Sequence, residues 1–492
     1  MNPNDNQPLK MRQSILRNWI SLSGLVIAVG SLFSFLLLFV LNTVAHLSNP
    51  YLGILTYLVA PGFLIIGLFL MAAGVLWQRH RLKVAAVPVR ALHIDLSRPE
   101  DRRNLVIFIL CSVTFLLVSA VGSYGTYQYT ESVQFCGEAC HTVMQLEFVT
   151  YEHGPHARVA CVECHIGSGA SWYVRSKISG AYQVYATLFD KYPRPIPTPV
   201  QNLRPAQETC EHCHWPRKFI GDVDRTYNYF QGDKTNTAFS VRLLLRVGGG
   251  DPTHGPVGGI HWHMSSNNRV EYIATDEGRQ KIPWVRLTDT QGIVTVFRAA
   301  TFTNDIHDYE IRTMDCVDCH NRPAHKFAPP DEAVNLAISL HQLDRSLPSI
   351  KSNAVSALVH PYKNDAEAQD NIRIFLAARY PEGAGLSNAI PVVQQVYADN
   401  FFPAMKAKWS DYPDNIGHRI WPGCFRCHDG EHKTEDGKRT IKVNGCNECH
   451  IILAQGSGPE LRQLAADGQP FKHPGGDLIP GFLCSDCHNG GP

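Results

Sequence analysis

The chain has little charge and almost no excess of either sign. Of its 492 residues, 45 are Lys or Arg and 44 are Asp or Glu, so charged residues make up 18% and the formal net charge is +1. A net charge this close to zero gives no general attraction for a polyanion, and nucleic-acid binding is not expected. The N-terminal region also lacks a small-residue cleavage site after a short apolar stretch, so we expect an uncleaved anchor and not a removed signal peptide.

Cysteines outside one recurring motif are nearly absent as well. Fourteen of the 15 cysteines form pairs followed directly by histidine, and only Cys111, in an apolar run, is left over. We expect Cys111 to be a buried thiol. Six motifs read C-x-x-C-H, and the first has one extra residue between its cysteines. The seven cysteine pairs are Cys136 and Cys140, Cys161 and Cys164, Cys210 and Cys213, Cys316 and Cys319, Cys424 and Cys427, Cys446 and Cys449, and Cys484 and Cys487; the histidines are His141, His165, His214, His320, His428, His450 and His488.

This motif is the attachment signature of c-type haem. The two thiols add to the haem vinyl groups, and the adjacent imidazole becomes the proximal ligand of the iron. A structural zinc site needs four ligands per ion and does not require a histidine directly after the second cysteine. Disulfides leave the histidine equally unexplained. The pattern therefore predicts seven covalently attached haems.

Three long uncharged runs precede the first motif, at about residues 19–45, 51–77 and 105–125. Each is long enough to cross ~30 Å of hydrocarbon as a helix. Basic residues gather before the first run and between the second and third, and the positive-inside rule places both segments in the cytoplasm. We therefore predict a multi-pass protein of the bacterial inner membrane, with a cytoplasmic N-terminus and its haem region in the periplasm.

The predicted fold class is a membrane-anchored multihaem cytochrome c, with three transmembrane α-helices and a loop-rich, mainly α periplasmic haem region that contains a small antiparallel β insertion. Runs rich in β-branched residues between 237 and 303, with a hairpin turn at 289–292, predict the insertion. Helical periodicity predicts helices over 331–346, 365–380 and 392–408. The predicted domains are a membrane anchor over 1–126, a three-haem module over 127–215, the β insertion and fourth haem over 216–330, a helical linking region over 331–423 and a C-terminal three-haem module over 424–492.

Residues 175–189 predict an amphipathic helix. Its apolar stripe includes Ile178, Tyr182, Tyr185 and Leu188, with Lys177 beside it. Such a helix suits the outer surface of a bilayer, with the aromatic side chains at headgroup depth. An ordinary helix packed on the second haem is the alternative.

Thirteen further histidines follow the third apolar run, more than seven irons need as second ligands. Two imidazole ligands close the iron to substrate and suit it to electron transfer. The candidates that we favour are His156, His261, His263, His325, His418, His432 and His473. Close to the first motif, Met144 is another candidate ligand, which would raise the potential of the first haem; simple packing is its alternative role.

Residues 136–186 resemble the core of the NapC/NirT/NrfH family of membrane-anchored quinol dehydrogenases. The matching residues are the first motif with Met144, then Tyr151 and His156, the second motif, and Lys177. The whole chain resembles the larger seven-haem, three-span inner-membrane cytochromes of metal-respiring bacteria in the same group. The resemblance implies that menaquinol is oxidised near the first haem, and that electrons pass to periplasmic or outer-membrane cytochromes in anaerobic or extracellular respiration.

The resemblance also implies a quinol site. In the family, a lysine twelve residues past the second-haem histidine helps to hold the quinol, and Lys177 stands at that distance from His165. The acidic residue that follows seven positions later in the family is replaced by Val184. Gln183 is adjacent and Asp190 lies further on, and of these we predict Gln183 as the second catalytic residue. A cation at this place can hydrogen-bond the quinol oxygen and stabilise negative charge as protons leave.

The resulting prediction is a quinol:cytochrome c oxidoreductase whose partners are the membrane quinol pool, the lipid bilayer and a periplasmic cytochrome. Two other functions stay open. The chain could be an electron carrier or docking wire without its own quinol site, which would give no spectral response to menaquinol. It could instead be a terminal multihaem oxyanion reductase, which would show a high-spin haem that binds nitrite or cyanide.

Overall fold

The structure is a computed structural model that describes residues 18–44, 59–84, 95–139, 141–167, 169–200, 204–215, 221–249, 258–265, 268–381, 385–442, 446–477 and 482–491. Cys140 and the start of the second predicted span lie outside the described residues, as do the side chains of Cys111, His141 and Cys446. The chain divides into two compact units, Met1–Cys136 with Cys161–Val184, and Gly137–Ala160 with Tyr185–Pro492. The finer predicted division into domains stays a prediction.

Three long helices belong to the first unit, and their bounds are α2 (Trp19–Val44), α4 (Ala60–Val84) and α5 (Pro99–Thr130). Glycine lets α2 and α4 pack closely. A Cβ atom on Gly24 would lie 2.5 Å from the amide nitrogen of Met71, and one on Gly67 would lie 2.6 Å from that of Ala28. Small residues at a close backbone contact are typical of helix pairs in membranes.

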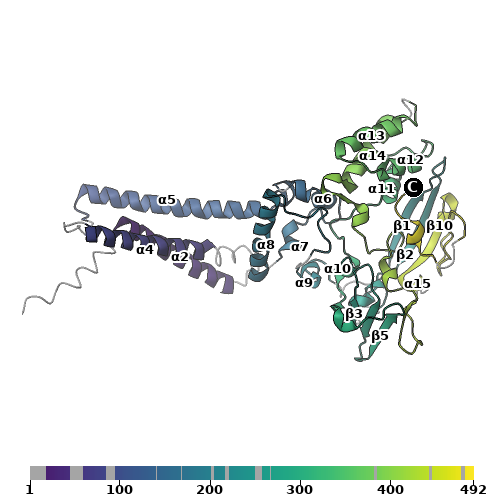
Figure 1. The fold of residues 1–492 in the computed structure, drawn as a ribbon, viewed down its shortest axis with the longest axis horizontal. Coiled ribbons are helices and arrows are strands. Elements are labelled where there is room, and N and C mark those ends of the chain that lie inside the picture. The colour runs from purple at the N-terminus through teal and green to yellow at the C-terminus, as the bar shows by residue number, and fades with distance from the viewer. Residues whose placement is uncertain are drawn as a thin grey trace, which may run out of the picture. The chain divides into compact units, whose positions relative to one another are not determined.

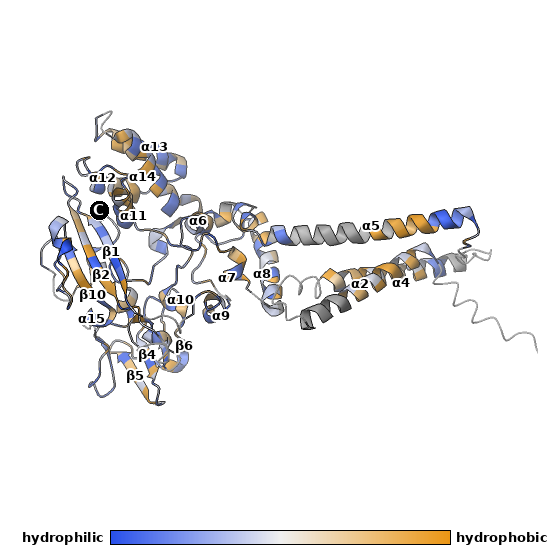
Figure 2. Ribbon diagram, turned by 180° about the vertical axis from the view of Figure 1, so that it is seen from behind, coloured by the Kyte–Doolittle hydropathy of each residue, from blue (hydrophilic) through white to orange (hydrophobic). Residues whose placement is uncertain are grey.

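The outward side chains of these helices are apolar. Phe33, Ile65 and Phe69 are 66%, 67% and 71% exposed, and Figure 2 shows apolar colours along most of the described length of α2 and α4. Among the described residues, one helix, Ala60–His80, is long and apolar enough to cross a membrane, and the apolar stretch Trp19–Phe35 is shorter. The predicted spans thus coincide with helices where they are described, and α4 is a candidate membrane helix. Three crossings stay a prediction.

Short helices carry the first three motifs. They are η2 (Phe135–Ala139), α6 (His141–Glu152), α7 (Cys161–His165) and α9 (Ala206–Cys210), with the longer α8 (Ala170–Leu188) after the second motif. α8 coincides with the amphipathic helix expected over 175–189. Its stripe is open to the surroundings, since Ile178, Tyr182 and Leu188 are 69%, 65% and 76% exposed. An exposed apolar stripe of this kind agrees with the interpretation as an interfacial helix.

Antiparallel sheets form part of the second unit (Figure 1). One has three strands in the order β1 (Val223–Phe230), β2 (Ala238–Leu245) and β10 (His450–Gly456). The other has the order β6 (Arg312–Thr313), β3 (Arg269–Ile273), β4 (Trp284–Thr288), β5 (Val294–Ala299) and β9 (His432–Lys433). β7 (Phe401–Phe402) and β8 (Ala407–Lys408) form a separate pair. In the first sheet Leu245 lies opposite both Val223 and His450.

The prediction of one small sheet over 237–303 was wrong in its topology. β2 pairs with β1 and β10, whereas β3, β4 and β5 belong to the five-stranded sheet. Strands from the C-terminal region, β9 and β10, complete both sheets. The alternation of apolar and polar residues specifies which face of a strand is buried, but it does not specify which distant strand is the partner.

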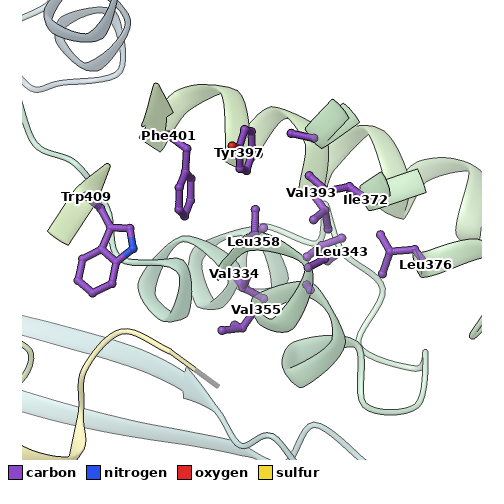
Figure 3. Close-up of a cluster of buried hydrophobic side chains, with 14 of the residues drawn as sticks. Val334, Leu343, Val355, Leu358, Ile372, Leu376, Val393, Tyr397, Phe401 and Trp409 are labelled. Carbon is purple, nitrogen blue, oxygen red and sulfur yellow. The ribbon is translucent and has the colours of Figure 1, made fainter. Parts of the chain in front are cut away.

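Four helices of the second unit enclose its main apolar core: α11 (Pro330–Ser339), α12 (Ile350–Val359), α13 (Asp365–Ala377) and α14 (Leu386–Asn400). Val334, Leu358, Ile372, Leu376 and Val393 are fully buried, and Figure 3 shows these side chains converging. The predicted helices coincide with α11, α13 and α14 but with shifted ends, and α12 was not predicted.

The remaining short elements are η4 (Ile260–Met264), η5 (Ile306–Asp308), α10 (Cys316–Cys319), η6 (Pro403–Met405), η7 (Trp409–Asp411), η8 (Gly423–Arg426), α15 (Cys446–Cys449), η9 (Gly458–Arg462) and α16 (Cys484–Cys487).

The core predicts a clear difference between two leucines. Leu358→Ala is expected to lower the free energy of unfolding by about 3 kcal/mol, because a fully buried leucine loses its transfer free energy and leaves a cavity. Leu340→Ala is the control, since Leu340 is 58% exposed, and its expected loss is below about 0.5 kcal/mol. Thermal unfolding of the haem-loaded protein, followed by circular dichroism, measures both. Equal losses would contradict the placement of the core.

Candidate haem and quinol sites

The C-x-x-C-H motifs fold as single tight turns. The amide of His214 donates to the carbonyl of Cys210 at 2.8 Å, and the amide of His320 makes the same bond to Cys316 at 2.8 Å. The fifth and seventh motifs repeat this bond. A bond across four residues is one helical turn, which brings the first cysteine and the histidine to one side of the backbone. A haem that is bound to the thiols and also ligated by the histidine needs these groups on the same side of the backbone.

Five motif histidines face a second histidine at nearly constant distance. The ring centres are 6.1 Å apart for His156 and His214, 6.3 Å for His261 and His320, 5.9 Å for His263 and His428, 6.2 Å for His418 and His450, and 5.9 Å for His473 and His488. A metal–imidazole bond is about 2 Å long and the ring centre lies about 1 Å beyond the nitrogen, so two imidazoles on opposite sides of one metal have centres about 6 Å apart. Each pair therefore leaves room for one haem iron.

Backbone carbonyls orient several of the outer histidines. The distances from Nδ1 to a carbonyl oxygen are 2.8 Å from His156 to Pro323, 3.0 Å from His261 to Val247, 2.8 Å from His263 to Ile260 and 2.9 Å from His325 to Glu147. A carbonyl only accepts, so Nδ1 carries the ring proton and Nε2 holds the lone pair. This is the usual support of a metal-binding histidine. His325 thus has the orientation of a ligand that would bind through Nε2.

Burial keeps many of these imidazoles neutral. Desolvation lowers the pKa values of His261, His320, His418, His428 and His450 below the ordinary value for histidine. Only neutral imidazole has a lone pair to give to a metal. These imidazoles therefore suit haem iron in two respects, the spacing of their rings and their neutral state.

His432 does not fit the role of an iron ligand that the sequence predicted. Its Nδ1 lies 2.8 Å from Oδ1 of Asp429 and its Nε2 lies 2.6 Å from the carbonyl oxygen of Ile282. Burial opposes a charge here, but the bonds to Asp429 and Ile282 outweigh it and raise the pKa of His432. A carboxylate and a carbonyl oxygen are both acceptors, so both nitrogens of His432 are engaged and neither offers a lone pair to iron. Its contacts assign His432 to the sheet, where it joins β9 to Ile282, two residues before β4.

The facing rings predict a spectroscopic effect. His156→Ala is expected to convert one haem from low-spin to high-spin, because the imidazole opposite His214 is removed. Electron paramagnetic resonance of the oxidised protein measures the change. The control is His212→Ala, because His212 lies in the same motif as His214 and is exposed. An unchanged low-spin signal in His156→Ala would contradict the pairing.

Motifs that are distant in the sequence lie next to each other in the second unit. The thiol of Cys210 is in hydrogen-bonding contact with Cys316, which lowers the pKa of Cys210. The helices of these two motifs are also joined by the amide of Ala206, which donates to Oδ2 of Asp315 at 3.2 Å. The third and fourth motifs are therefore neighbours. The rate of electron transfer falls steeply with distance, and the haems of these two motifs would lie close enough for rapid transfer.

The fourth and fifth motifs form a second neighbouring pair. His261 and His263 are separated by one residue in η4, and they face the histidines of the fourth and fifth motifs. Arg426, inside the fifth motif, donates to the carbonyl oxygen of Asp318 at 2.6 Å. Asp318 itself is 3% exposed and accepts from the Tyr272 hydroxyl of β3 at 2.5 Å. The five-stranded sheet thus positions both motifs through one buried residue, because the Asp318 carboxylate accepts from Tyr272 and the Asp318 carbonyl accepts from Arg426.

The boundary between the two units runs through the first motif. Within the first unit the thiols of Cys136 and Cys161 are in contact, which raises the pKa of Cys136 and lowers that of Cys161 to about 7. Met144 follows His141 by three residues in α6, so both positions are on the same face of that helix. They cannot bind one iron from opposite sides. His141 and Met144 are therefore alternative ligands on one side of an iron, and the role of Met144 as a ligand stays a prediction.

Lys177 contacts a carboxylate that was not predicted from the sequence. Its Nζ meets Oε1 of Glu131, the residue directly after α5, and lies 5.0 Å from the centre of the Tyr173 ring. Glu131 is 8% exposed, and the side chain of Lys177 is 33% exposed. Burial and the charge of Glu131 raise the pKa of Tyr173 to about 12. The three side chains form a polar group at the end of an apolar helix.

Gln183 lies on a different side of α8 from Lys177. Six residues separate them, which is about 240° around a helix, and the amide of Gln183 donates to Oγ of Ser179 at 3.3 Å. Its predicted catalytic role has no support in this geometry. The signal for Glu131 was present in the sequence, because Glu131 is the only charged residue between Arg103 and Cys136.

The geometry disfavours zinc and disulfides as explanations of the cysteines. The twelve cysteines whose side chains are described form no disulfide with one another. In the described part of the chain, no group of three or more His, Cys, Asp and Glu side chains could hold a metal ion. Turns that present two thiols and a histidine, with a second imidazole opposite, are typical of c-type haem sites.

These features define a c-type cytochrome with covalently bound haem, and the chain belongs to the NapC/NirT cytochrome c family, whose N-terminal region matches residues 98–195. Members of this family are membrane-anchored redox proteins in quinol-linked electron transfer. The chain is similar to cytochrome c-type protein ImcH of Geobacter sulfurreducens, with 39% identity over 499 residues that cover 98% of this chain and 96% of that protein. That likeness supports a role in respiration. No solved structure matches the chain.

Proposed function

We propose that the chain is a menaquinol dehydrogenase. It oxidises menaquinol at the periplasmic face of the inner membrane, near the first haem, and relays the electrons through seven c-type haems to periplasmic or outer-membrane cytochromes. The observation that carries the proposal is the contact of Lys177 on α8 with Tyr173 of the same helix and with Glu131, the residue directly after apolar helix α5. A quinol is held in lipid by its tail and presents its head at the surface, so its site is expected at such a place.

The proposed topology has three membrane spans. They correspond to α2, α4 and α5. Basic residues between the second and third spans, among them Arg79, Arg81, Arg102 and Arg103, would hold that loop in the cytoplasm. The end of α5 then lies at the periplasmic face, and the haem motifs that follow it are outside.

The proposed relay uses iron with two histidine ligands. The five facing pairs would ligate haems three to seven, with His156, His261, His263, His418 and His473 as the second ligands. His325 is proposed as a further ligand, because its Nδ1 bond to the carbonyl of Glu147 orients it in the same way. The attached haems would supply the electron-accepting and electron-carrying chemistry.

Lys177 would hold the quinol. Its ammonium group has three donors, of which one meets Glu131, and another can donate to a quinol oxygen. The positive charge would stabilise negative charge that develops on that oxygen as its proton leaves. The ring of Tyr173 below the ammonium would restrict its position through a cation–π contact. Burial of Glu131 limits the access of water to the group.

Steady-state turnover of the purified full chain tests the proposal. Menaquinol is the donor and a soluble ferric cytochrome c is the acceptor. We expect saturable turnover that a non-oxidisable quinol analogue inhibits competitively. An electron wire without a quinol site would transfer electrons from a chemical reductant to the acceptor but show no menaquinol-dependent turnover. A terminal reductase would instead turn over nitrite and bind it at a high-spin haem.

A further inference from the structure

The contact between Glu131 and Lys177 has a chemical consequence beyond holding the lysine. A carboxylate with 8% exposure is costly to bury unless it is paired. The chain nevertheless places one directly after α5, in a segment with no other charged residue between Arg103 and Cys136. The charged partner of Glu131 is Lys177, the residue on which the proposed quinol site depends.

Oxidation of a quinol needs a proton acceptor as well as an electron acceptor. Lys177 cannot take a proton as an ammonium ion, because it has donors only. Val184, which stands at the family's acidic position, has no basic atom. Gln183 is neutral and bonded to Ser179 on another side of α8. These residues leave the proposed site without the base that its reaction requires.

The ionisable groups that face Glu131 cannot fill this role either. Tyr173 of α8 stays protonated, since burial and Glu131 raise its pKa to about 12. Cys136 of η2 has a raised pKa through its contact with Cys161 and burial, and in the mature protein its sulfur is bound to haem. Lys177 is the third described group that faces Glu131. Among these groups the carboxylate of Glu131 is the one whose oxygens offer lone pairs to a proton.

We propose that Glu131 is the proton acceptor for the quinol that Lys177 holds; this inference rests on the proposed function. Each quinol O–H bond breaks with its proton moving to the Glu131 carboxylate, which then releases it to periplasmic water before the next transfer. The two electrons pass to ferric haem, the oxidant that the proposed function supplies. The balance is one quinol giving one quinone, two protons and two reduced haem irons. Lys177 keeps its charge throughout and steadies both oxygens in turn.

Glu131→Gln tests the role, since glutamine keeps the size and an acceptor oxygen but loses the basicity. We expect the rate of menaquinol-driven haem reduction to fall by about a hundredfold or more, as for the loss of a general base. Binding of a quinone analogue, haem content and reduction by dithionite are expected to stay close to the parent. Glu131→Asp keeps a base and is expected to retain part of the rate, which covers the case in which Glu131→Gln misfolds. Glu152→Gln, an exposed carboxylate at the end of α6, is the matched control.

Infrared difference spectra give a readout that does not depend on turnover. When quinol reduces the parent, we expect a band of a newly protonated carboxyl group, absent in Glu131→Gln and present in Glu152→Gln. Parental rates in Glu131→Gln would overturn the inference and leave the proposed function intact. Loss of rate together with loss of analogue binding would show that Glu131 only positions Lys177, and would also overturn it. A parent that menaquinol does not reduce would overturn the proposed function and this inference together.

Discussion

Replacing Lys177 by alanine is expected to reduce the kcat/KM for menaquinol by about 10²- to 10³-fold, the usual effect of removing one preorganised charge from a reacting oxygen. The residue contacts Glu131 and lies over the Tyr173 ring, so its loss also leaves a buried carboxylate without this cation. Anaerobic stopped-flow absorbance of haem reduction measures the effect. Haem content and full reduction by dithionite check that the variant is folded and loaded.

A matched cation on the same helix provides the control. Arg175 lies two residues before Lys177 on α8, is exposed, and stacks on Trp172 with a distance of 5.2 Å to the ring centre. Arg175→Ala removes one positive charge from α8 without touching the group around Lys177, so its kcat/KM is expected to stay within a few-fold of the parent. Equal losses in the two variants would mean that the charge of α8 matters in general and that Lys177 has no specific role.

Removing both histidines of η4 is expected to have the second large effect. In the double variant His261→Ala, His263→Ala, the fourth and fifth haems lose the imidazoles that face His320 and His428. Two haems are then expected to become high-spin, since an iron with one axial histidine has an open position. Electron flow from quinol to a cytochrome acceptor is expected to fall by at least about tenfold, because altered ligands shift the potentials of two adjacent haems.

The control for this variant is a histidine in a similar short helix. His307 lies in η5 and is exposed, so His307→Ala is expected to leave both the spin state and the electron flow unchanged. Electron paramagnetic resonance and acceptor reduction are measured on the same samples. A double variant that keeps its low-spin signal would contradict the proposed ligation of both haems.

The haem motifs illustrate what local sequence can predict. Two thiols and a histidine within five residues need one turn of backbone, so Cys316, Cys319 and His320 are recognisable without any tertiary information. Apolar runs long enough to be membrane helices are local in the same sense, and α2, α4 and α5 coincide with them where they are described. The helical periodicity of apolar residues predicted α11, α13 and α14 of the second unit, but it did not predict where each helix ends.

The partners of these local features are set by the tertiary fold. His418 and His473 could be proposed as ligands from the supply of histidines, but only the folded chain brings them to His450 and His488. His432 has the same residue type and a similar spacing from a motif, yet Asp429 and Ile282 take both of its nitrogens. The sequence does not distinguish a histidine bonded in this way from an iron ligand.

The carboxylate partner of Lys177 in the proposed quinol site was also not predicted from the local sequence. The family resemblance implies an acidic group near Lys177, and the sequence neighbour Gln183 was predicted in its place, but Gln183 lies on another side of α8. The carboxylate comes from a different element, after α5. A lone charge at the end of a long apolar run is a usable signal, because a polar residue beside a membrane helix is expensive unless it has a function.

The most direct test of the central claim is to add menaquinol, without oxygen, to the purified full chain in lipid vesicles that contain no other protein, and to follow the haem absorbance. The account predicts that the reduced-haem band grows to most of the amplitude that dithionite produces, and that a quinol analogue blocks its growth. Haems that dithionite reduces but menaquinol leaves oxidised would contradict it.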